Sequence, residues 1–515
     1  MLIKDFIEFQ GTVTLITRPR RFGKTLNMTM LREFFDITTD SRVIFDGLAI
    51  MDTEYASQIN SRPVIFLSFK DCKGNTPESL LFMLNTIVLD EYEKYYRILK
   101  GNTDDSYYEF YMVYQKLRER SLDTNYLLIS IKTLEQALTR YYHINPIVLI
   151  DEYDQPIVSS FEYGYHDEMK AFFSGFYGAA LKSQEYMEQA MLTGIQRVVK
   201  ESIFSQLNNI RVYTVLDEEY SSHFGLTTGE TEELLRSYGL ILDESVKRQY
   251  NGYLFGGTEI YNPWSLLCYA DTGRLENYWI NTSTNYLVRS SIDDADKLFH
   301  EKLDKLISED TVKVNADLEC SLIEIKTNNA LWGLLVNAGY VTVAERVGQY
   351  MMTVRIPNGE VRSEFIKIIA SRANVQDIDL HTMLQCLLNK DMDGFLDVYR
   401  ALVLSCTSYH DAKENAYHML FLGMCLSLQG IYKITSNIES GHGRSDIRME
   451  SLSGERPHII IEFKQGEAVD TLKEEALKQI LDNRYHAGLH GEVLCVGIAH
   501  DKKKCEIAYT MVESK

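Results

Sequence analysis

The stretch Arg18-Pro-Arg-Arg-Phe-Gly-Lys-Thr25 stands between two segments of different periodicity. Residues 12–17 (TVTLIT) are β-branched or apolar and predict a buried strand. Residues 26–35 have the spacing of an amphipathic helix. A loop ending in Gly-Lys-Thr between a strand and a helix is typical of nucleotide phosphate binding, because the amide groups and the helix dipole at the helix N-terminus favour negative charge.

Each residue of this loop has an expected task. We expect Lys24 to reach the β- and γ-phosphates and the Thr25 hydroxyl to bind Mg²⁺. The other loop residues expected to bind the nucleotide are Arg18, Arg20, Arg21, Phe22 and Gly23. The pattern departs from the common motif at its first position, where Arg18 replaces glycine. Gly-Lys-Thr by itself therefore also fits an ordinary helix start.

A second motif completes the expected nucleotide site. Residues 146–152 (PIVLIDE) predict a buried parallel strand that ends in two acids. We expect Asp151 to hold Mg²⁺ through water and Glu152 to polarise the attacking water. The alternative is a core strand whose end happens to be acidic. Two motifs in the right order and local structure favour the nucleotide site.

Other segments fit the same sheet. Strands are predicted at residues 63–69, 190–193 and 210–215, and helices at residues 78–97 and 166–183. This alternation predicts a parallel sheet covered on both faces.

The segment Thr193-Gly-Ile-Gln-Arg197 ends one of these strands beside the expected γ-phosphate position. A polar strand end there can act as a sensor, with Arg197 opposing transition-state charge. A helix cap followed by a surface arginine explains the same residues, and the sequence leaves both interpretations open.

Five longer strings extend these motifs: LITRPRRFGKTLNMTML, VLIDEYDQPI, LTGIQRVVKESIFSQLNN, YNGYLFGGTEIYNPWSLL and YWINTSTNYLV. They resemble the AAA-ATPase-like family of bacterial proteins over nearly the whole chain. The resemblance implies ATP and Mg²⁺ as ligands, and an arginine at the position of Arg18 is usual in that family. Its members typically carry a Tyr-Val-Asp-Lys-Thr element upstream of the first strand, where this sequence begins at Met1. We expect lower nucleotide affinity if that element is missing.

Members of that family commonly end in a PD-(D/E)XK nuclease-like module, and the strings ESGHGRSDIRME and IIIEFK resemble it. Alternation along residues 458–464 places Glu462 and Lys464 on one face of a strand. We expect Asp446 and Glu462 to bind one or two Mg²⁺ ions, and Lys464 to orient water or neutralise developing charge. Glu414, on a predicted helix, is a further expected metal ligand.

A zinc site is the rival interpretation of that helix. His410, Glu414 and His418 recur at every fourth residue, but no HExxH pattern or obvious fourth ligand accompanies them. We therefore favour the nuclease role for Glu414. Residues 479–485 loosely resemble a Gln/Tyr element of related nucleases, to which we give no weight.

The middle of the chain predicts two smaller units. Residues 227–230 (TTGE) form a capping-box pattern, and residues 225–300 are expected to form a helical lid. A helix, a hairpin and a second helix over residues 331–370 suggest a winged-helix-like unit. Such units contact DNA or serve for packing within the chain, and we favour packing because the expected wing has few basic residues.

We therefore expect an α/β protein with a P-loop NTPase parallel sheet, a helical lid and a winged-helix-like unit, followed by an α/β restriction-endonuclease-like domain. The expected boundaries are 1–224 for the ATPase core, 225–300 for the lid, 301–380 for the winged-helix-like unit and 381–515 for the nuclease-like domain.

Composition limits the setting. The chain has 515 residues and eight cysteines without a CxxC pair, which favours free thiols in the cytoplasm. No signal peptide is evident, and residues 418–428 are too short and too polar to span a bilayer. The net charge of −20 argues against a protein that coats nucleic acid. Residues 381–515 carry 15 Lys/Arg and 19 Asp/Glu, so this part contributes only −4.

The expected function is an ATP-binding and ATP-hydrolysing protein coupled to a Mg²⁺-dependent nuclease-like domain that acts on DNA or RNA. The alternative is a nucleotide-switched scaffold whose C-terminal domain binds without cleaving. A homo-oligomer is left open, since no second arginine for a neighbour's site stands out.

Overall fold

The computed structural model describes residues 1–101, 107–121, 123–182, 185–197, 209–279, 286–309, 311–319, 327–372, 377–405, 421, 432–440, 443–454, 456–501 and 504–514. They fall into two compact units, Met1–Ala295 with Lys313–Asn358 and Asp296–Val312 with Gly359–Lys515. None of the helices in these ranges is long and apolar enough to cross a membrane.

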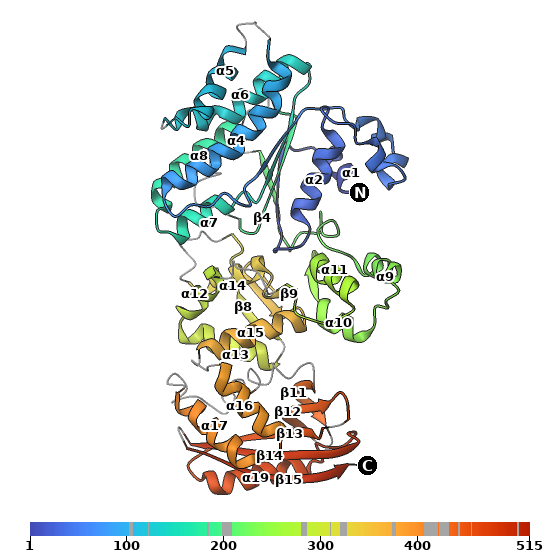
Figure 1. Ribbon diagram of the computed structural model, residues 1–515, viewed down its shortest axis with the longest axis vertical. Helices are drawn as coiled ribbons and strands as arrows, with labels where there is room; N and C mark the ends of the chain where they lie inside the picture. Colours follow the sequence, from blue (N-terminus) through green and yellow to red (C-terminus); the bar gives the residue numbers. More distant parts are fainter. Residues whose placement is uncertain are drawn as a thin grey trace. The chain divides into compact units, whose positions relative to one another are not determined.

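A five-stranded parallel sheet forms the centre of the first unit (Figure 1). Its strands, in spatial order, are β2 (Val64–Ser68), β3 (Ile147–Asp151), β4 (Gln189–Gly194), β1 (Val13–Thr17) and β5 (Ile210–Tyr213). Every residue of β1 and β3 is buried, as expected for a sheet covered on both faces. All five strands were predicted. Strand β4 lies between β1, which leads into the first motif, and β3, which carries the second.

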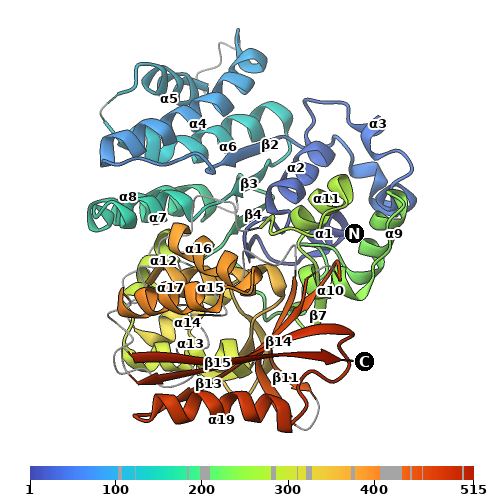
Figure 2. The same ribbon diagram turned by 60° about the horizontal axis from the view of Figure 1, so that its bottom comes forward.

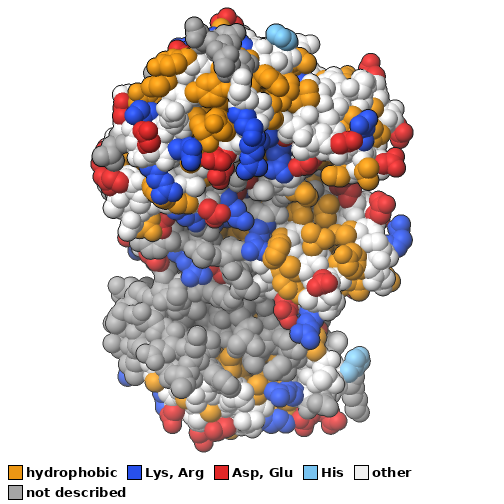
Figure 3. Space-filling view, turned by 45° about the horizontal axis from the view of Figure 1, so that its top comes forward, with side chains coloured by type: hydrophobic (Ala, Val, Ile, Leu, Met, Phe, Trp, Pro, Cys, Tyr) orange, Lys and Arg blue, Asp and Glu red, His pale blue; other side chains and the backbone are white. Residues whose placement is uncertain are grey.

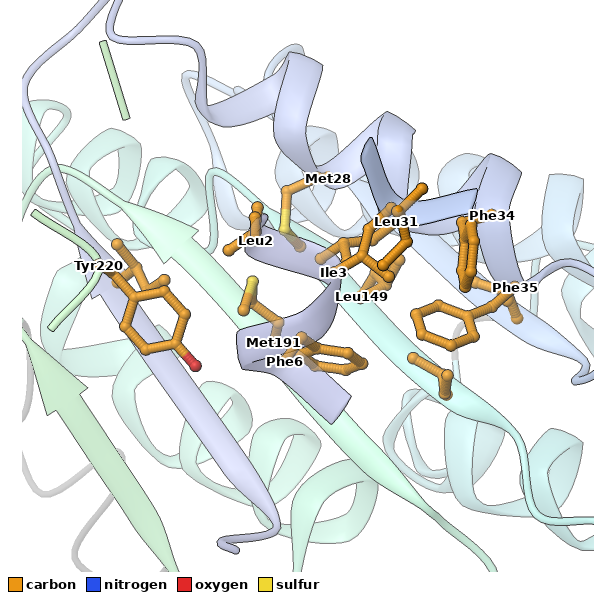
Figure 4. Packing of buried hydrophobic residues seen from close by; sticks show 14 of the residues in the cluster. Leu2, Ile3, Phe6, Met28, Leu31, Phe34, Phe35, Leu149, Met191 and Tyr220 are labelled. Atoms are coloured by element: carbon orange, nitrogen blue, oxygen red, sulfur yellow. The ribbon is translucent and has the colours of Figure 1, made fainter. Parts of the chain in front are cut away.

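One face of the sheet is covered by α1 (Leu2–Glu8) and α2 (Lys24–Phe35). Figure 4 shows Leu2, Phe6 and Met28 from these helices packed against Leu149 and Met191 of the sheet. After α2 follow α3 (Arg42–Phe45) and two 3₁₀ turns, Ala49–Asp52 and Glu54–Gln58.

The other face is covered by helices that belong to the crossovers between strands (Figure 1). They are α4 (Pro77–Leu99), α5 (Tyr108–Arg118), α6 (Asn125–Tyr142), α7 (Gln155–Glu162) and α8 (His166–Leu181). The start of α4 follows from its sequence: Thr76 accepts a hydrogen bond from the Ser79 amide, and Pro77 occupies the first turn.

The expected lid contains helices and a hairpin. Its elements are α9 (Thr228–Ser237), α10 (Glu244–Tyr250), β6 (Tyr253–Phe255), β7 (Thr258–Ile260), α11 (Pro263–Thr272) and α12 (Tyr286–Asp293). The capping box predicted at Thr227 and Glu230 is confirmed. The hairpin was not predicted, although Gly256 and Gly257, both at positive φ, are typical of a two-residue hairpin turn.

The predicted helix and hairpin that follow are α14 (Asn328–Ala338), β9 (Thr342–Arg346) and β10 (Met351–Arg355). An unpredicted strand, β8 (Thr311–Asn315), completes a three-stranded sheet in the order β8-β10-β9. The second predicted helix is α15 (Gly359–Arg372), and it belongs to the second unit.

The second unit contains a mixed five-stranded sheet. Its strands, in order, are β11 (Tyr432–Ser440), β12 (Gly443–Ser451), β13 (His458–Gln465), β14 (Gly491–Asp501) and β15 (Lys504–Ser514). The pair β13–β14 is parallel and the other pairs are antiparallel. Its helices within the described residues include α13 (Lys297–Glu309), α15, α16 (Asp377–Leu388), α17 (Met392–Ser405) and α19 (Val469–Asp482).

The parallel pair needs a crossover, and α19 supplies it (Figure 2). The helix packs closely on β14 at Gly497, where a Cβ would lie 2.4 Å from the carbonyl oxygen of Lys473. Glycine allows this approach because it has no side chain.

Charged side chains of both signs share the visible surface of the first unit. Figure 3 shows Lys and Arg interspersed with Asp, Glu and hydrophobic side chains on the face turned toward the viewer. The described part of this face therefore presents no broad surface of a single charge.

Candidate functional site

The loop between β1 and α2 turns sharply at two residues with positive φ. Arg21 has φ 67° and Gly23, the N-cap of α2, has φ 79°. Glycine adopts this conformation without strain. The first amides of a helix have no partner within the helix, so this turn leaves the N-terminus of α2 open toward the loop. That is the backbone arrangement that favours an anion.

Lys24, a residue of the first predicted motif, also contacts the second. Its Nζ donates hydrogen bonds to the carbonyl oxygens of Arg18 at 3.2 Å and Pro19 at 3.1 Å. The same atom lies 3.5 Å from Oε1 of Glu152. The ammonium group is buried, and these three oxygens compensate its loss of water.

Asp151 is the centre of a hydrogen-bond network at the carboxyl ends of three strands. Its Oδ2 accepts from the Thr25 hydroxyl at 2.7 Å, and its Oδ1 accepts from the Thr193 hydroxyl at 2.8 Å. The Ser68 hydroxyl donates to Oδ2 at 3.4 Å. Burial raises the pKa of Asp151, and the hydrogen bond from Thr25 opposes that rise. Adjacent hydroxyl and carboxylate oxygens are ligands that suit Mg²⁺.

Glu152 leaves the strand in an unusual backbone conformation. Its φ of 57° lies in the left-handed region, which a residue with a side chain adopts at some cost. The conformation ends β3 directly after Asp151 and sets the Glu152 carboxylate near Lys24. Strained residues of this kind concentrate at functional sites.

Asp154 is a third acid in this region, and we did not single it out from the sequence. Its Oδ2 accepts from the amides of Ile195 at 2.9 Å and Gln196 at 2.8 Å. Burial raises the pKa of Asp154 to about 6, and the charge of Glu152 adds to the rise. A Cβ on Gly194 would lie 2.7 Å from Oδ1 of Asp154, so the glycine makes room for the carboxylate. The string VLIDEYDQPI contained the signal, as an acid two residues beyond the pair.

Arg18 directs its side chain into the protein interior. The guanidinium donates to the carbonyl oxygens of Thr17 at 2.9 Å, Tyr213 at 3.4 Å and Tyr220 at 3.1 Å. It also lies over the rings of Phe224 and Phe255. Burial lowers the pKa of Arg18 to about 10. The side chain thus connects the loop to the end of β5 and to the hairpin of β6 and β7.

Other predicted loop residues also contact aromatic side chains of residues 253–279. Phe22 is buried against Tyr253 and Phe255. The carbonyl oxygen of Arg20 accepts from Nε1 of Trp279 at 3.4 Å, and the guanidinium of Arg21 lies 4.3 Å from the ring centre of Trp264.

Arg197, the predicted sensor arginine, forms an ion pair with Glu319. Thr193 of the same strand end contacts Asp151, so the structure brings Thr193 to the acid pair while the Arg197 guanidinium pairs with an acid of the 317–319 segment.

In the second unit, β12 and β13 separate where the predicted acids lie. Their pairing ends at Ile447 and Ile461. Beyond it, the Asp446 carboxylate accepts from the Phe463 amide at 2.8 Å, and the Asp446 amide donates to Oε2 of Glu462 at 3.3 Å. Side-chain oxygens therefore replace main-chain carbonyls at this point.

Glu462 and Lys464 lie on one face of β13, as the alternation predicts, with Nζ of Lys464 3.9 Å from Oε1 of Glu462. Glu462 is buried. Burial raises the pKa of Asp446, and the hydrogen bond from the Phe463 amide and the charge of Lys464 oppose that rise. Two neighbouring carboxylates are donors that suit Mg²⁺.

Gln479 of α19 joins this group, although we gave it no weight in the sequence. Its amide nitrogen donates to Oε1 of Glu462 and, at 3.2 Å, to the Tyr485 hydroxyl. Asn483 donates to the same hydroxyl at 3.0 Å.

The predicted ligand Glu414 and the zinc candidates His410 and His418 lie outside the described residues. Within the described ranges, no group of three or more His, Cys, Asp or Glu side chains is placed to hold a metal ion. The structure thus brings together two of the three acids predicted for the C-terminal site.

Comparisons with known proteins match both ends of the chain. Residues 1–204 match the family model described as predicted AAA-ATPase, and residues 412–510 match the PD-(D/E)XK nuclease superfamily. Over these two ranges, the resemblance drawn from the sequence is confirmed. The chain is 25% identical over 505 residues to the "Uncharacterized protein in vnfD 5'region" of Azotobacter chroococcum mcd 1. This similarity extends over 92% of this chain and 86% of that protein.

Proposed function

We propose that the N-terminal domain, which matches the predicted AAA-ATPase model, binds and hydrolyses ATP. The observation that carries this proposal is the 2.7 Å hydrogen bond between the Thr25 hydroxyl and the Asp151 carboxylate. It joins two residues that are 126 positions apart in the chain. They come from the two motifs that together hold Mg²⁺ at the phosphates in nucleotide-hydrolysing proteins.

Each side chain then has a defined role. Lys24 exchanges its carbonyl partners in the loop for the β- and γ-phosphates, while Thr25 and Asp151 hold the metal ion. Glu152 accepts a hydrogen bond from the attacking water and orients it. Mg²⁺, when bound, neutralises charge on the phosphates. Among the loop residues, Arg20, Arg21 and Gly23 contribute to binding, and Arg18 and Phe22 shape the loop from the interior.

Phosphate release and nucleotide binding test this proposal separately. Lys24→Ala should abolish binding, because the loop loses its phosphate contact. Glu152→Gln should retain binding and lower kcat on the order of 100-fold, the effect of removing a general base. Glu162→Gln, an exposed position on α7, is the matched control and should behave as the native chain. A native chain that binds no ATP would contradict the proposal.

We further propose that the C-terminal domain cleaves phosphodiester bonds in DNA or RNA with Mg²⁺. The proposal is supported by the match to the PD-(D/E)XK superfamily and by the contacts among Asp446, Glu462 and Lys464. The two carboxylates hold the metal, Lys464 orients water or neutralises charge, and Gln479 fixes the Glu462 carboxylate. Mg²⁺, when bound, lowers the pKa of the attacking water.

Cleavage assays on single-stranded, duplex and branched DNA and on RNA test this second activity. Asp446→Ala and Lys464→Ala should each remove cleavage, whereas Lys478→Ala, exposed on α19, should not. Cleavage that persists in Asp446→Ala would contradict the proposed site.

A nucleotide-switched scaffold that binds without cleaving is the second candidate. It is favoured by one observation: both carboxylates already accept hydrogen bonds from protein donors, Phe463 and Gln479. Metal titration separates the candidates. Mg²⁺ binding that is lost in Asp446→Ala supports the nuclease, and absence of metal binding by the native chain supports the scaffold. If ATP leaves cleavage by the native chain unchanged, the nucleotide does not control it.

A further inference from the structure

The C-terminal end of α14 lies against the phosphate loop. Gly339, which ends the helix at φ 83°, would bring a Cβ to within 2.8 Å of the Pro19 side chain. The carbonyl oxygen of Gly339 accepts from the Tyr253 hydroxyl at 3.1 Å. Any larger residue at position 339 would displace the loop, so loop and helix end are in close contact.

The same helix end reaches the other side of the nucleotide site. Nδ2 of Asn337 donates to Oε1 of Gln196 at 3.3 Å and to the carbonyl oxygen of Leu318 at 3.0 Å. Both Asn337 and Gln196 are buried. The Gln196 amide is in turn held by Asp154, and Thr193 on the same strand end donates to Asp151.

Further contacts tie the 317–319 segment to this arrangement. Arg197 pairs with Glu319. A Cβ on Gly333 of α14 would lie 1.9 Å from the carbonyl oxygen of Asp317, so the segment rests directly on the helix. The turn at residues 195–197, the segment 317–319 and the end of α14 therefore form one closely packed group.

We infer that Asn337 is a positioning residue for the nucleotide site, which couples the strand end at Thr193 to the 313–358 segment. The inference rests on the proposed ATP site. Because Gln196 and Asn337 are buried, a shift of the 195–197 turn must either leave polar groups without partners or move α14 with it. The segment 313–358 continues into the second unit at Gly359, so the chain itself connects this helix to the rest of the protein.

Two variants of the full-length chain test the coupling. Gln196→Ala removes the acceptor of Asn337 and keeps the main-chain bond to Asp154. Asn337→Asp keeps the shape and removes both donated hydrogen bonds. Asn329→Asp, an exposed position in the first turn of α14, is the matched control. The measurements are the affinity for a fluorescent ADP analogue, kcat and KM for ATP, and hydrogen exchange in residues 328–358 with and without ATP and Mg²⁺.

In the native chain and in Asn329→Asp, nucleotide should change hydrogen exchange in residues 328–358. In both test variants the affinity should stay within about threefold, kcat should fall by about three- to tenfold, the scale of one buried hydrogen bond, and the exchange response should disappear. KM should change little, because the loop contacts remain.

The outcomes separate this inference from the proposal beneath it. Nucleotide binding by the native chain without any exchange response in residues 328–358 would overturn the coupling alone. A full response in Gln196→Ala would do the same, even if Asn337→Asp fails to fold. A native chain that binds no nucleotide would overturn the ATP site and the coupling together.

Discussion

Arg18 replaces the glycine of the common loop, and its contacts give the substitution a structural reason. Replacing Arg18 by glycine, the residue of the common loop, should therefore lower the free energy of unfolding. Arg18→Gly removes three donated hydrogen bonds and two ring contacts, which are worth about 2–4 kcal/mol together. Urea unfolding measures the loss. Arg274→Gly, in an exposed loop, should change the free energy of unfolding by less than about 1 kcal/mol.

If Arg18→Gly and Arg274→Gly are equally stable, the contacts of Arg18 contribute nothing to stability.

The sequence led us to place Arg18 among the nucleotide ligands, a role that stays a prediction. It offered no way to find the partners of its side chain, since Tyr213 and Tyr220 are 195 and 202 residues away. Lys24, Thr25, Asp151 and Glu152 could be predicted as site residues because their motifs are local.

Asp154 gives stability a defined dependence on pH. Its folded pKa of about 6 lies above the ordinary 3.8, so the folded chain binds more protons between these values, and stability from this group falls as pH rises from 4 to 6. The effect is about 3 kcal/mol at most. Asp154→Asn should lose it. The difference in unfolding free energy between native chain and variant, measured from pH 4 to 7, isolates this group.

Asp243, an exposed helix cap, serves as the control for that series. Its pKa is lowered, chiefly by the Ser245 hydroxyl, so its stabilising contribution is lost only as pH falls below the ordinary value. The difference for Asp243→Asn should stay level above pH 4. A level difference for Asp154→Asn as well would show that Asp154 has no raised pKa.

At the scale of elements, the position of α19 sets the geometry of the C-terminal site. A Cβ on Gly497 would lie 2.4 Å from a carbonyl oxygen and 2.5 Å from the amide of Leu477, both in the main chain of that helix. Gly497→Ala should therefore displace α19 and destabilise the second unit by about 1–3 kcal/mol. It should also draw Gln479 away from Glu462 and weaken Mg²⁺ binding. Unfolding and metal titration measure the two effects.

Gly229→Ala, on α9 with open space around the glycine, is the control and should be neutral or slightly stabilising. Unchanged stability and metal binding in Gly497→Ala would contradict the role of α19. The sequence predicted β13 because its apolar residues are local and its polar residues alternate, whereas β11 was not predicted. It gave Gln479 no clear role because the register of a crossover helix depends on contacts such as Gly497, which no local pattern contains.

The predicted elements of the middle region show the same limit. The capping box at Thr227 and the hairpin of β9 and β10 were predicted from local signals. Strand β8 was missed because it is far in the sequence from the hairpin of β9 and β10 that it joins, with α14 between them. Alternation over five residues is a weak signal without that partner.

At the scale of the molecule, the chain passes between its two units three times, after Ala295, Val312 and Asn358. The sequence suggested contiguous domains, including one at 301–380, and these boundaries stay predictions. Helix α13 and strand β8 are neighbours in the chain yet belong largely to different units. Composition carries no signal for such a return, because both segments are ordinary globular sequence.

This division makes a last prediction about how nucleotide acts on stability. Calorimetry should resolve an unfolding transition that responds to ATP and Mg²⁺, since the proposed ligands all lie in the first unit. Ligand at 100 times its Kd stabilises a binding unit by about 2.7 kcal/mol. Lys24→Ala should abolish the shift and Asp446→Ala should leave it intact. If the three covalent crossings merge the two transitions, nucleotide should raise the unfolding temperature of the whole chain as one transition. A rise in unfolding temperature that survives in Lys24→Ala would place the nucleotide elsewhere.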